Sequence, residues 1–161
     1  MAKPPSIRFL FAHPAHFFAL GCGSGLAPKA PGTFGTLFAW GTFALFHEHF
    51  PVFGLFFLLT VAYLAGIWFI NITGRAIGDP DHGSIVWDEI VPFWLVLALT
   101  PGGFLWQLAA FALFRLFDIT KPQPARYFDE HVKKGFGVMA DDLIAAGYTL
   151  LCLALLKIIL A

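Results

Sequence analysis

Long apolar runs separated by short polar segments dominate the chain and predict a bundle of membrane helices. The clearest run covers residues 52–70, a stretch of 19 residues without a charge. At about 1.5 Å per residue, such a helix is roughly 28 Å long, close to the thickness of a bilayer core. A second run, residues 143–161, is interrupted only by Lys157 near its end, where the side chain can reach the membrane surface.

Three shorter apolar stretches complete the predicted bundle. Residues 84–100 and 104–117 flank the sequence TPGG, whose proline and glycines predict a turn between two antiparallel helices. Residues 34–46 cross a bilayer only together with their flanks, and residues 14–20 predict an interfacial or re-entrant segment. We therefore expect an all-α, polytopic membrane bundle of four to five transmembrane helices, formed by one domain over residues 1–161.

The composition agrees with a membrane protein. Hydrophobic residues make up 58% of the chain and charged residues 12%, against about 25% charged residues in soluble domains. The formal net charge is zero, so nucleic acid is not an expected partner. Cys22 and Cys152 form neither a zinc motif nor a disulfide framework. The apolar run that ends at Cys22 is broken by His13, Pro14 and His16, which argues against a cleaved lipoprotein signal.

The charged residues gather at one side of the predicted bundle. In a five-helix topology, six basic residues share that side: Lys29, Arg75, Lys121, Arg126, Lys133 and Lys134. The positive-inside rule makes this side cytoplasmic. Nine of the ten acidic residues lie on the same side or at its edge, and Glu48 is the exception. This distribution predicts an ionic site facing the cytoplasm.

The first polar segment, GCGSGLAPKAPGTFGTL, surrounds Lys29 with five glycines and with hydroxyl groups that include those of Thr33 and Thr36. Backbone amides in such a loop can approach an anion closely, and the following helix points its positive end at the same face. The segment is not a Walker loop, because Ala30 follows the lysine where Ser or Thr is needed. The alternative is a Gly/Pro-rich entry turn with Thr33 as the helix cap.

The second segment, DPDHGSIVWDE, carries Asp81, His82, Asp88 and Glu89. These residues could supply hard oxygen ligands for a cation and a proton carrier. Adjacent residues on a helix diverge by about 100°, so we expect one of Asp88 and Glu89 to face the site while the other binds a cation or a neighbouring donor. The alternative is that the acids only complement the helix dipole, which explains two adjacent acids poorly.

The third segment is FRLFDITKPQPARYFDEHVKKGFGVMADD, residues 114–142. Arg115, Asp118 and Lys121 are spaced by three, which predicts that they share one helix face. A charge such as Asp118 inside an apolar run is costly and usually functional, although an internal Arg115–Asp118 pair is the alternative. The later charged residues include Arg126 and Lys133 on an amphipathic link and Asp141 and Asp142, expected to open the last helix.

Taken together, GSGLAPKAPGTFGTL, DHGSIVWDE and FDITKPQPARYFDEHVKKGFGVMADDLIAAG resemble the phosphatidylglycerophosphatase A family. The matching segments occur in order over residues 23–147. The resemblance implies a multi-pass enzyme of the bacterial inner membrane that depends on Mg²⁺. Its implied substrate is the membrane lipid phosphatidylglycerophosphate, whose terminal phosphate is hydrolysed to leave phosphatidylglycerol.

The residue types fit metal-assisted hydrolysis of a phosphomonoester. The expected metal ligands are Asp81, Asp88, Glu89, Asp118, Asp141 and Asp142. The expected catalytic residues are Asp88, Glu89, Asp118, Asp142 and His82. The expected phosphate-binding residues are Lys29, Thr33, Thr36, Lys121, Arg126 and Lys133. A small ion or proton transporter is the rival interpretation, because intramembrane acids also mark ion paths. The sequence leaves open which acids bind metal directly, how many ions bind, the nucleophile and the oligomeric state.

Overall fold

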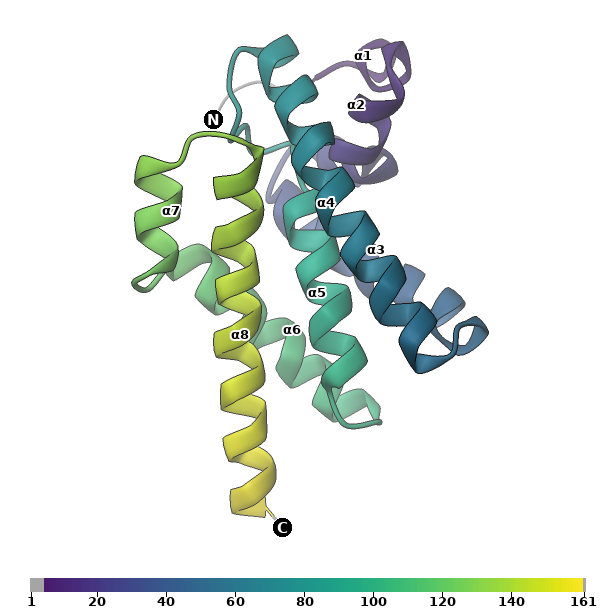
Figure 1. Cartoon of the computed structure of the whole chain (residues 1–161), viewed down its shortest axis with the longest axis vertical. Coiled ribbons are helices and arrows are strands. Elements are labelled where there is room, and N and C mark those ends of the chain that lie inside the picture. Colours follow the sequence, from purple (N-terminus) through teal and green to yellow (C-terminus); the bar gives the residue numbers. More distant parts are fainter. Residues whose placement is uncertain (1–4, 161) are drawn as a thin grey trace.

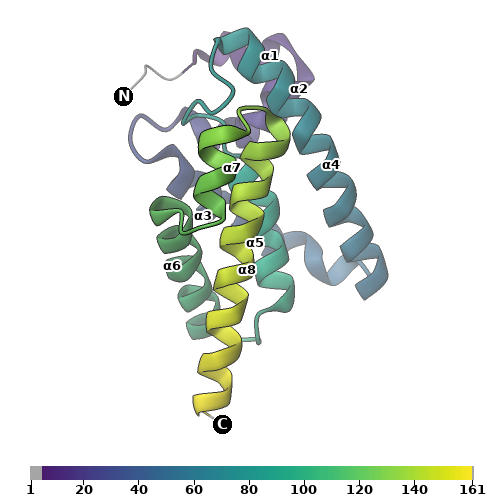
Figure 2. The ribbon, with the colours of Figure 1, turned by 60° about the vertical axis from the view of Figure 1, so that its left-hand side comes forward.

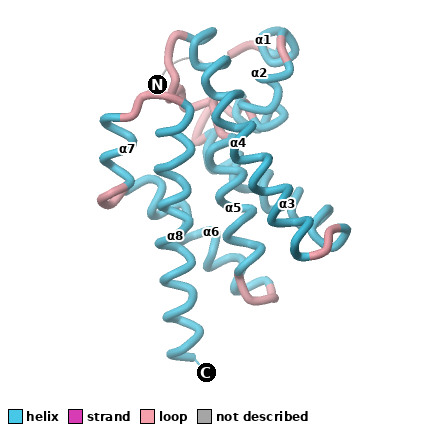
Figure 3. Tube along the Cα trace, viewed as in Figure 1, coloured by secondary structure: helices cyan, strands magenta, loops and turns pink. Residues whose placement is uncertain are grey.

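The computed structural model describes residues 5–160, which form helices, turns and loops without a strand (Figures 1 and 3). This confirms the all-α prediction. Residues 1–4 and 161 lie outside the described range. Residue 161 is the last residue of the helix predicted over 143–161. The helices are α1 (Ile7–Ala12), α2 (Pro14–Ala19), η1 (Gly21–Leu26), α3 (Pro31–Phe46), η2 (His47–His49), α4 (Val52–Ile77), α5 (Trp87–Leu99), α6 (Phe104–Thr120), α7 (Ala125–His131) and α8 (Gly135–Leu160).

Within residues 5–160, two helices are long and apolar enough to cross a membrane. α4 and α8 each contain 26 residues, or about 39 Å at the usual rise. Large apolar side chains such as Phe53 and Ile159 are exposed on them, as expected of surfaces that face lipid. α3, α5 and α6 contain 16, 13 and 17 residues, fewer than the roughly 20 of a typical spanning helix. Helix length alone therefore leaves the predicted count of four to five spans untested.

Successive long helices run in opposite directions, which sorts the connections into two groups (Figures 1 and 2). η2, the turn over residues 100–103 and the C-terminus lie toward one end of the bundle. The loop over residues 78–86 and the link over residues 132–134 lie toward the other end, together with α1 and α2. α5 and α6 are joined by the predicted TPGG turn, so the helical hairpin expected from the sequence is confirmed.

α5 lies at the centre of the bundle and packs against α3, α4 and α8. Nine of its 13 residues are buried. Its buried indole N–H groups find backbone carbonyls on neighbouring helices: Trp87 Nε1 donates to Ala62 on α4 at 3.0 Å, and Trp94 Nε1 donates to Ala39 on α3 at 2.9 Å. These bonds hold the helix that carries the adjacent acids in a fixed place between its neighbours.

The N-terminal segment folds as two short helices, of which α2 packs against α4. Ser6 caps α1 by accepting from the Phe9 amide, and the His13 ring caps α2 by accepting from the Ala15 amide. The His16 ring lies 2.9 Å from the Thr73 hydroxyl on α4. The segment predicted at residues 14–20 thus corresponds to α2, and the apolar run toward Cys22 is not one continuous helix.

Helix α3 begins at Pro31, earlier than the apolar run suggested. Its N-cap residue is Ala30, which adopts a left-handed conformation with φ 48°, and no side chain caps the helix. The interpretation of Thr33 as the cap is therefore wrong. Proline suits the first helical position because its missing N–H would have no partner there.

Helix α8 begins at Gly135, eight residues before its expected start at 143. The Gly135 amide donates to the Asn71 side chain of α4 at 2.9 Å. A Cβ at this position would collide with the backbone carbonyl of Ile67, so only glycine permits the close approach of the two helices. As a consequence, Asp141 and Asp142 lie about two turns inside α8, and the prediction that they open the last helix is wrong.

Candidate functional site

The start of α5 places Asp88 and Glu89 inside the bundle. Both lie in the first turn, where their charges complement the helix dipole. The preceding Val86 amide donates to the Ala19 carbonyl at 2.9 Å, which ties this turn to the N-terminal helices. Glu89 accepts a hydrogen bond from Arg115 on α6 at 2.9 Å. Asp88 is 8% exposed and one of its oxygens, Oδ1, has no hydrogen-bond partner.

Three carboxylates from three helices converge beside this turn. Glu89 of α5, Asp118 of α6 and Asp142 of α8 each offer one oxygen, and these oxygens lie within 4.8 Å of one another. Asp118 and Asp142 are 8% and 2% exposed. These three residues, here called the carboxylate triad, are all among the predicted metal ligands. The structure thus joins residues that are up to 53 positions apart in the chain.

Arg115 lies against the carboxylate triad and was not among the predicted site residues. Its guanidinium forms ion pairs with Glu89 at 2.9 Å and with Asp118 one turn further along α6. A second contact, 3.5 Å long, reaches the Thr36 hydroxyl on α3. The i, i+3 spacing in FRLFD was the available signal, but it indicated only a pair within one helix. The link to Glu89 depends on how α5 and α6 pack.

Lys121 belongs to a different cluster from the one expected. It follows the end of α6 in a left-handed conformation, with φ 42°, so its side chain leaves the face shared by Arg115 and Asp118. Its ammonium group lies 2.7 Å from Asp129 and 2.5 Å from Asp141. The prediction of one shared helix face therefore holds for two of the three residues and is wrong for Lys121.

The cluster around Lys121 extends to the loop before α5. Lys133 lies 3.7 Å from Asp81. Burial raises the pKa of Asp81, against the effect of the two lysines. Burial acts to lower the pKa of Lys121, but Asp141 and Asp129 outweigh it and the pKa is raised. For Asp129, burial acts to raise the pKa, but Lys121 outweighs it and the pKa is lowered. The ion pairs thus favour the charged forms of Lys121 and Asp129.

Three buried side-chain atoms in the described part of the chain have neither a hydrogen-bond partner nor an ion pair: Asp88 Oδ1, Glu89 Oε2 and Arg115 Nε. All three lie at or next to the carboxylate triad. An unsatisfied buried polar group costs about 1–3 kcal/mol, and more when it is charged. Carboxylate oxygens are also the ligands that Mg²⁺ prefers. The donor set therefore fits a divalent cation bound at the triad.

The other predicted residues lie around this centre in different settings. His82 is buried, and its Nδ1 accepts from the Ser84 amide at 3.2 Å. Thr36 is buried, and its hydroxyl donates to the Gly32 carbonyl at 2.9 Å. Three predicted phosphate-binding residues are exposed, namely Lys29, Arg126 and Lys133, and Thr33 is partly buried. Lys133 also lines a hollow of about 400 Å³ between the end of α4 and the start of α8.

Comparison with known proteins places these residues in a family. The family described as phosphatidylglycerophosphatase A matches residues 17–157, a range that contains every predicted site residue. The chain belongs to the phosphatidylglycerophosphatase A family. This confirms the resemblance seen in the three polar segments. The comparison with solved structures gave no match.

Three bacterial relatives align over most of the chain. The protein named phosphatidylglycerophosphatase A of Haemophilus influenzae is 45% identical over 150 residues, which are 91% of each chain. The Escherichia coli protein of the same name is 38% identical over 142 residues, covering 86% of this chain and 80% of its own. A Bacteroides thetaiotaomicron relative, 38% identical over 144 residues, is provisionally named a phosphatidylinositol-3-phosphatase. The alignment covers 89% of the Bacteroides protein and 85% of this chain.

Proposed function

We propose that the chain hydrolyses the terminal phosphomonoester of phosphatidylglycerophosphate, releasing phosphate and leaving phosphatidylglycerol. The observation that carries the proposal is the carboxylate triad with the unpartnered Oε2 of Glu89, inside the region that matches the phosphatidylglycerophosphatase A family. Two relatives carry the name of this activity. The reaction breaks the bond between phosphorus and the glycerol oxygen, and water supplies the new oxygen on phosphorus.

Glu89, Asp118 and Asp142 are the residues that we propose hold Mg²⁺, with Asp88 beside them. When bound, Mg²⁺ offsets charge on phosphate oxygens and lowers the pKa of coordinated water. The unpartnered Oε2 of Glu89 and the convergence of the three carboxylates support these assignments. Asp81 and Asp141 were also predicted ligands. Asp141 is paired with Lys121, so we propose that it acts by holding that lysine near the site.

The side chains proposed to bind phosphate are cationic and lie on the surrounding loops. Lys29 is exposed on the loop before α3, and Arg126 is exposed on α7, 4.0 Å from Glu130. Charge-assisted hydrogen bonds from such groups are stronger than neutral ones. Since His82 Nδ1 accepts from the Ser84 amide, the neutral ring carries its proton on Nε2. We propose that His82 Nε2–H donates a hydrogen bond to the leaving glycerol oxygen, whose proton comes from the attacking water.

We also propose that the chain crosses the bacterial inner membrane several times, with the site facing the cytoplasm. Two apolar helices of 26 residues support membrane insertion. The helix directions put the loops that carry Lys29, Asp81 and Lys121 toward the same part of the bundle (Figure 2). The rival function, a transporter, would need polar side chains that lead from this site to the opposite end of the bundle. The pocket described near that end is lined almost entirely by apolar side chains, from Leu105 to Ala109 on α6 and from Leu156 to Leu160 on α8.

The test is release of inorganic phosphate from phosphatidylglycerophosphate by the purified protein in detergent micelles. We expect turnover with Mg²⁺, its loss after chelation and its return on adding Mg²⁺. Asp142→Asn should reduce turnover by at least about 10²-fold, comparable with typical acid–base contributions. Glu48→Gln, an exposed change at the opposite end of the bundle, is the matched control and should leave turnover unchanged.

Three results would contradict these proposals. Full turnover after thorough chelation would reject the metal. Normal turnover by folded Asp142→Asn would remove that residue from the site. Release from phosphatidylinositol 3-phosphate and none from phosphatidylglycerophosphate would reject the substrate while leaving the phosphatase chemistry intact.

A further inference from the structure

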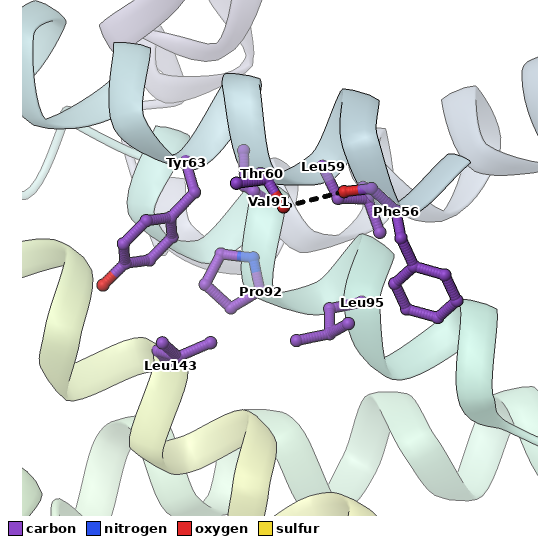
Figure 4. A pocket seen from close by; sticks show the side chains of 8 residues that line it. All are labelled: Phe56, Leu59, Thr60, Tyr63, Val91, Pro92, Leu95 and Leu143. Carbon is purple, nitrogen blue, oxygen red and sulfur yellow. Dashed lines mark hydrogen bonds between the residues drawn. The ribbon is translucent and has the colours of Figure 1, made fainter. Parts of the chain in front are cut away.

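An apolar groove of about 220 Å³ lies between α4, α5 and α8 (Figure 4). Its walls include Phe56, Leu59 and Tyr63 from α4, Val91 and Leu95 from α5, and Leu143 from α8. The three α4 residues are spaced at i, i+3 and i+7, so one face of that helix forms a continuous wall. From Phe56 to Tyr63, seven steps of about 1.5 Å each, the wall runs for about 10 Å along the helix axis.

The groove begins next to the acidic site. Leu143 directly follows Asp142 in α8, and Val91 lies three residues after Asp88, hence one turn further along the same face of α5. Tyr63 stands at this end, and Figure 4 shows its hydroxyl directed at α8. Along α5 and α8, the groove therefore lies within one turn of residues of the acidic site.

The chemistry of the walls selects a hydrocarbon. Away from Tyr63, the one hydroxyl on the wall belongs to Thr60, and it donates to the Phe56 carbonyl at 2.8 Å, as drawn in Figure 4. A polar ligand would therefore lose its hydrogen bonds to water without finding replacements. An apolar chain would lose none, and it would cover side chains such as Leu95 that are otherwise partly exposed.

We propose that this groove holds one acyl chain of the lipid substrate while the phosphate of the same molecule lies at the carboxylate triad. The inference rests on the proposed function, since it takes the substrate to be an amphiphile with a phosphate head. Tyr63 would mark the boundary between the two parts. Binding energy from the chain would then position the phosphate, which is how remote parts of a substrate contribute to turnover.

The test compares substrates of one head group and different chain lengths. Leu95→Trp places a large ring in the groove, about two turns from the first turn of α5, and Thr60→Trp does so from an exposed position. Leu64→Trp is the matched control, because Leu64 is 60% exposed on α4 and does not line the groove. Each protein is assayed for kcat/KM on dihexanoyl and dipalmitoyl phosphatidylglycerophosphate in mixed micelles.

We expect both groove variants to lose kcat/KM on the dipalmitoyl substrate by about tenfold, equivalent to about 1.4 kcal/mol, while their values on the dihexanoyl substrate stay at the wild-type level. The control should match wild type on both. Equal losses on both substrates, or a control that behaves like the groove variants, would reject the assignment and leave the groove to bulk lipid. If wild type released phosphate from neither substrate, the proposed function itself would fail.

Discussion

Replacing Gly32 by alanine should displace the Glu89 carboxylate by adding a single methyl group. Gly32 lies in the first turn of α3, and a Cβ built there would overlap Glu89 Oε1 and stand 2.9 Å from Oε2. Ordinary Cβ contacts are 3.4–4 Å. The carboxylate must therefore retreat by on the order of 1 Å, and a displacement of that size can cost about 10²-fold in turnover. We expect a loss of that order.

The Gly32→Ala variant should nevertheless remain folded. The atoms in its way belong to the end of a flexible side chain, and alanine is the better helix former by up to about 1 kcal/mol. Gly41→Ala is the matched control on the same helix, because a Cβ at that position meets nothing within 4 Å. It should keep wild-type turnover.

A double-mutant cycle with Glu89→Asp makes the prediction specific. Aspartate is one methylene shorter, so its carboxylate does not reach Gly32. The combined variant should then lose no more activity than Glu89→Asp alone, a clear departure from additivity. The measurements are phosphate release in micelles and unfolding by a denaturing detergent. Wild-type turnover by folded Gly32→Ala, or strictly additive losses, would refute the reasoning.

Three further predictions concern charge and topology. Arg115→Met should lower the free energy of unfolding by about 3 kcal/mol, as expected when one partner of a buried pair is removed, and a loss below about 1 kcal/mol in a detergent titration would argue against the pairing. Burial opposes ionisation of Asp129, but Lys121 outweighs it and lowers the pKa of the folded state. The ionised carboxylate therefore stabilises the fold at pH values above its unfolded pKa of about 4. This stabilisation is lost as the pH falls through the lower pKa of the folded state. Asp129→Asn should therefore be less stable than wild type at neutral pH and equally stable in strong acid, whereas a constant difference would contradict this. Single cysteines can be placed at Lys29, Gln123 or His49 in a chain whose two native cysteines are replaced. On intact cells, an impermeant thiol reagent should label the cysteine at position 49 but not those at positions 29 and 123. Labelling of position 29 together with position 49 would overturn the topology.

Periodicity and composition were enough to predict the five long helices, because long apolar runs and proline-rich or glycine-rich turns are local signals. The hairpin around TPGG followed from such local signals. The start of α8 did not, because Gly135 begins the helix only where it can approach α4 closely and bond to Asn71. That contact joins positions far apart in the sequence.

The sequence also identified the acidic residues without showing how they divide into clusters. Six acids were equivalent candidates for metal binding, and spacing alone gave no reason to separate Asp141 from Asp142. In the structure, Asp141 pairs with Lys121 while Asp142 joins Glu89 and Asp118. The division follows from the left-handed conformation of Lys121, which turns that side chain away from α6. The spacing of three residues between charged positions does not predict the backbone conformation of the residue that follows a helix end.

Helix packing holds the carboxylate triad together, although bringing three buried carboxyl groups close to one another costs free energy. Arg115 pairs with Glu89 and Asp118, yet Glu89 Oε2 remains without a hydrogen bond, and Asp142 adds a third buried carboxyl group. Repulsion alone would separate these groups. The indole bonds from α5 to its neighbours and the close approach of α8 to α4 hold α5 and α8 in place, so the side chains of Glu89 and Asp142 cannot move apart freely. The residues that destabilise the folded chain are thus those that the proposed phosphate chemistry requires, which is the pattern expected where local rules give way to function.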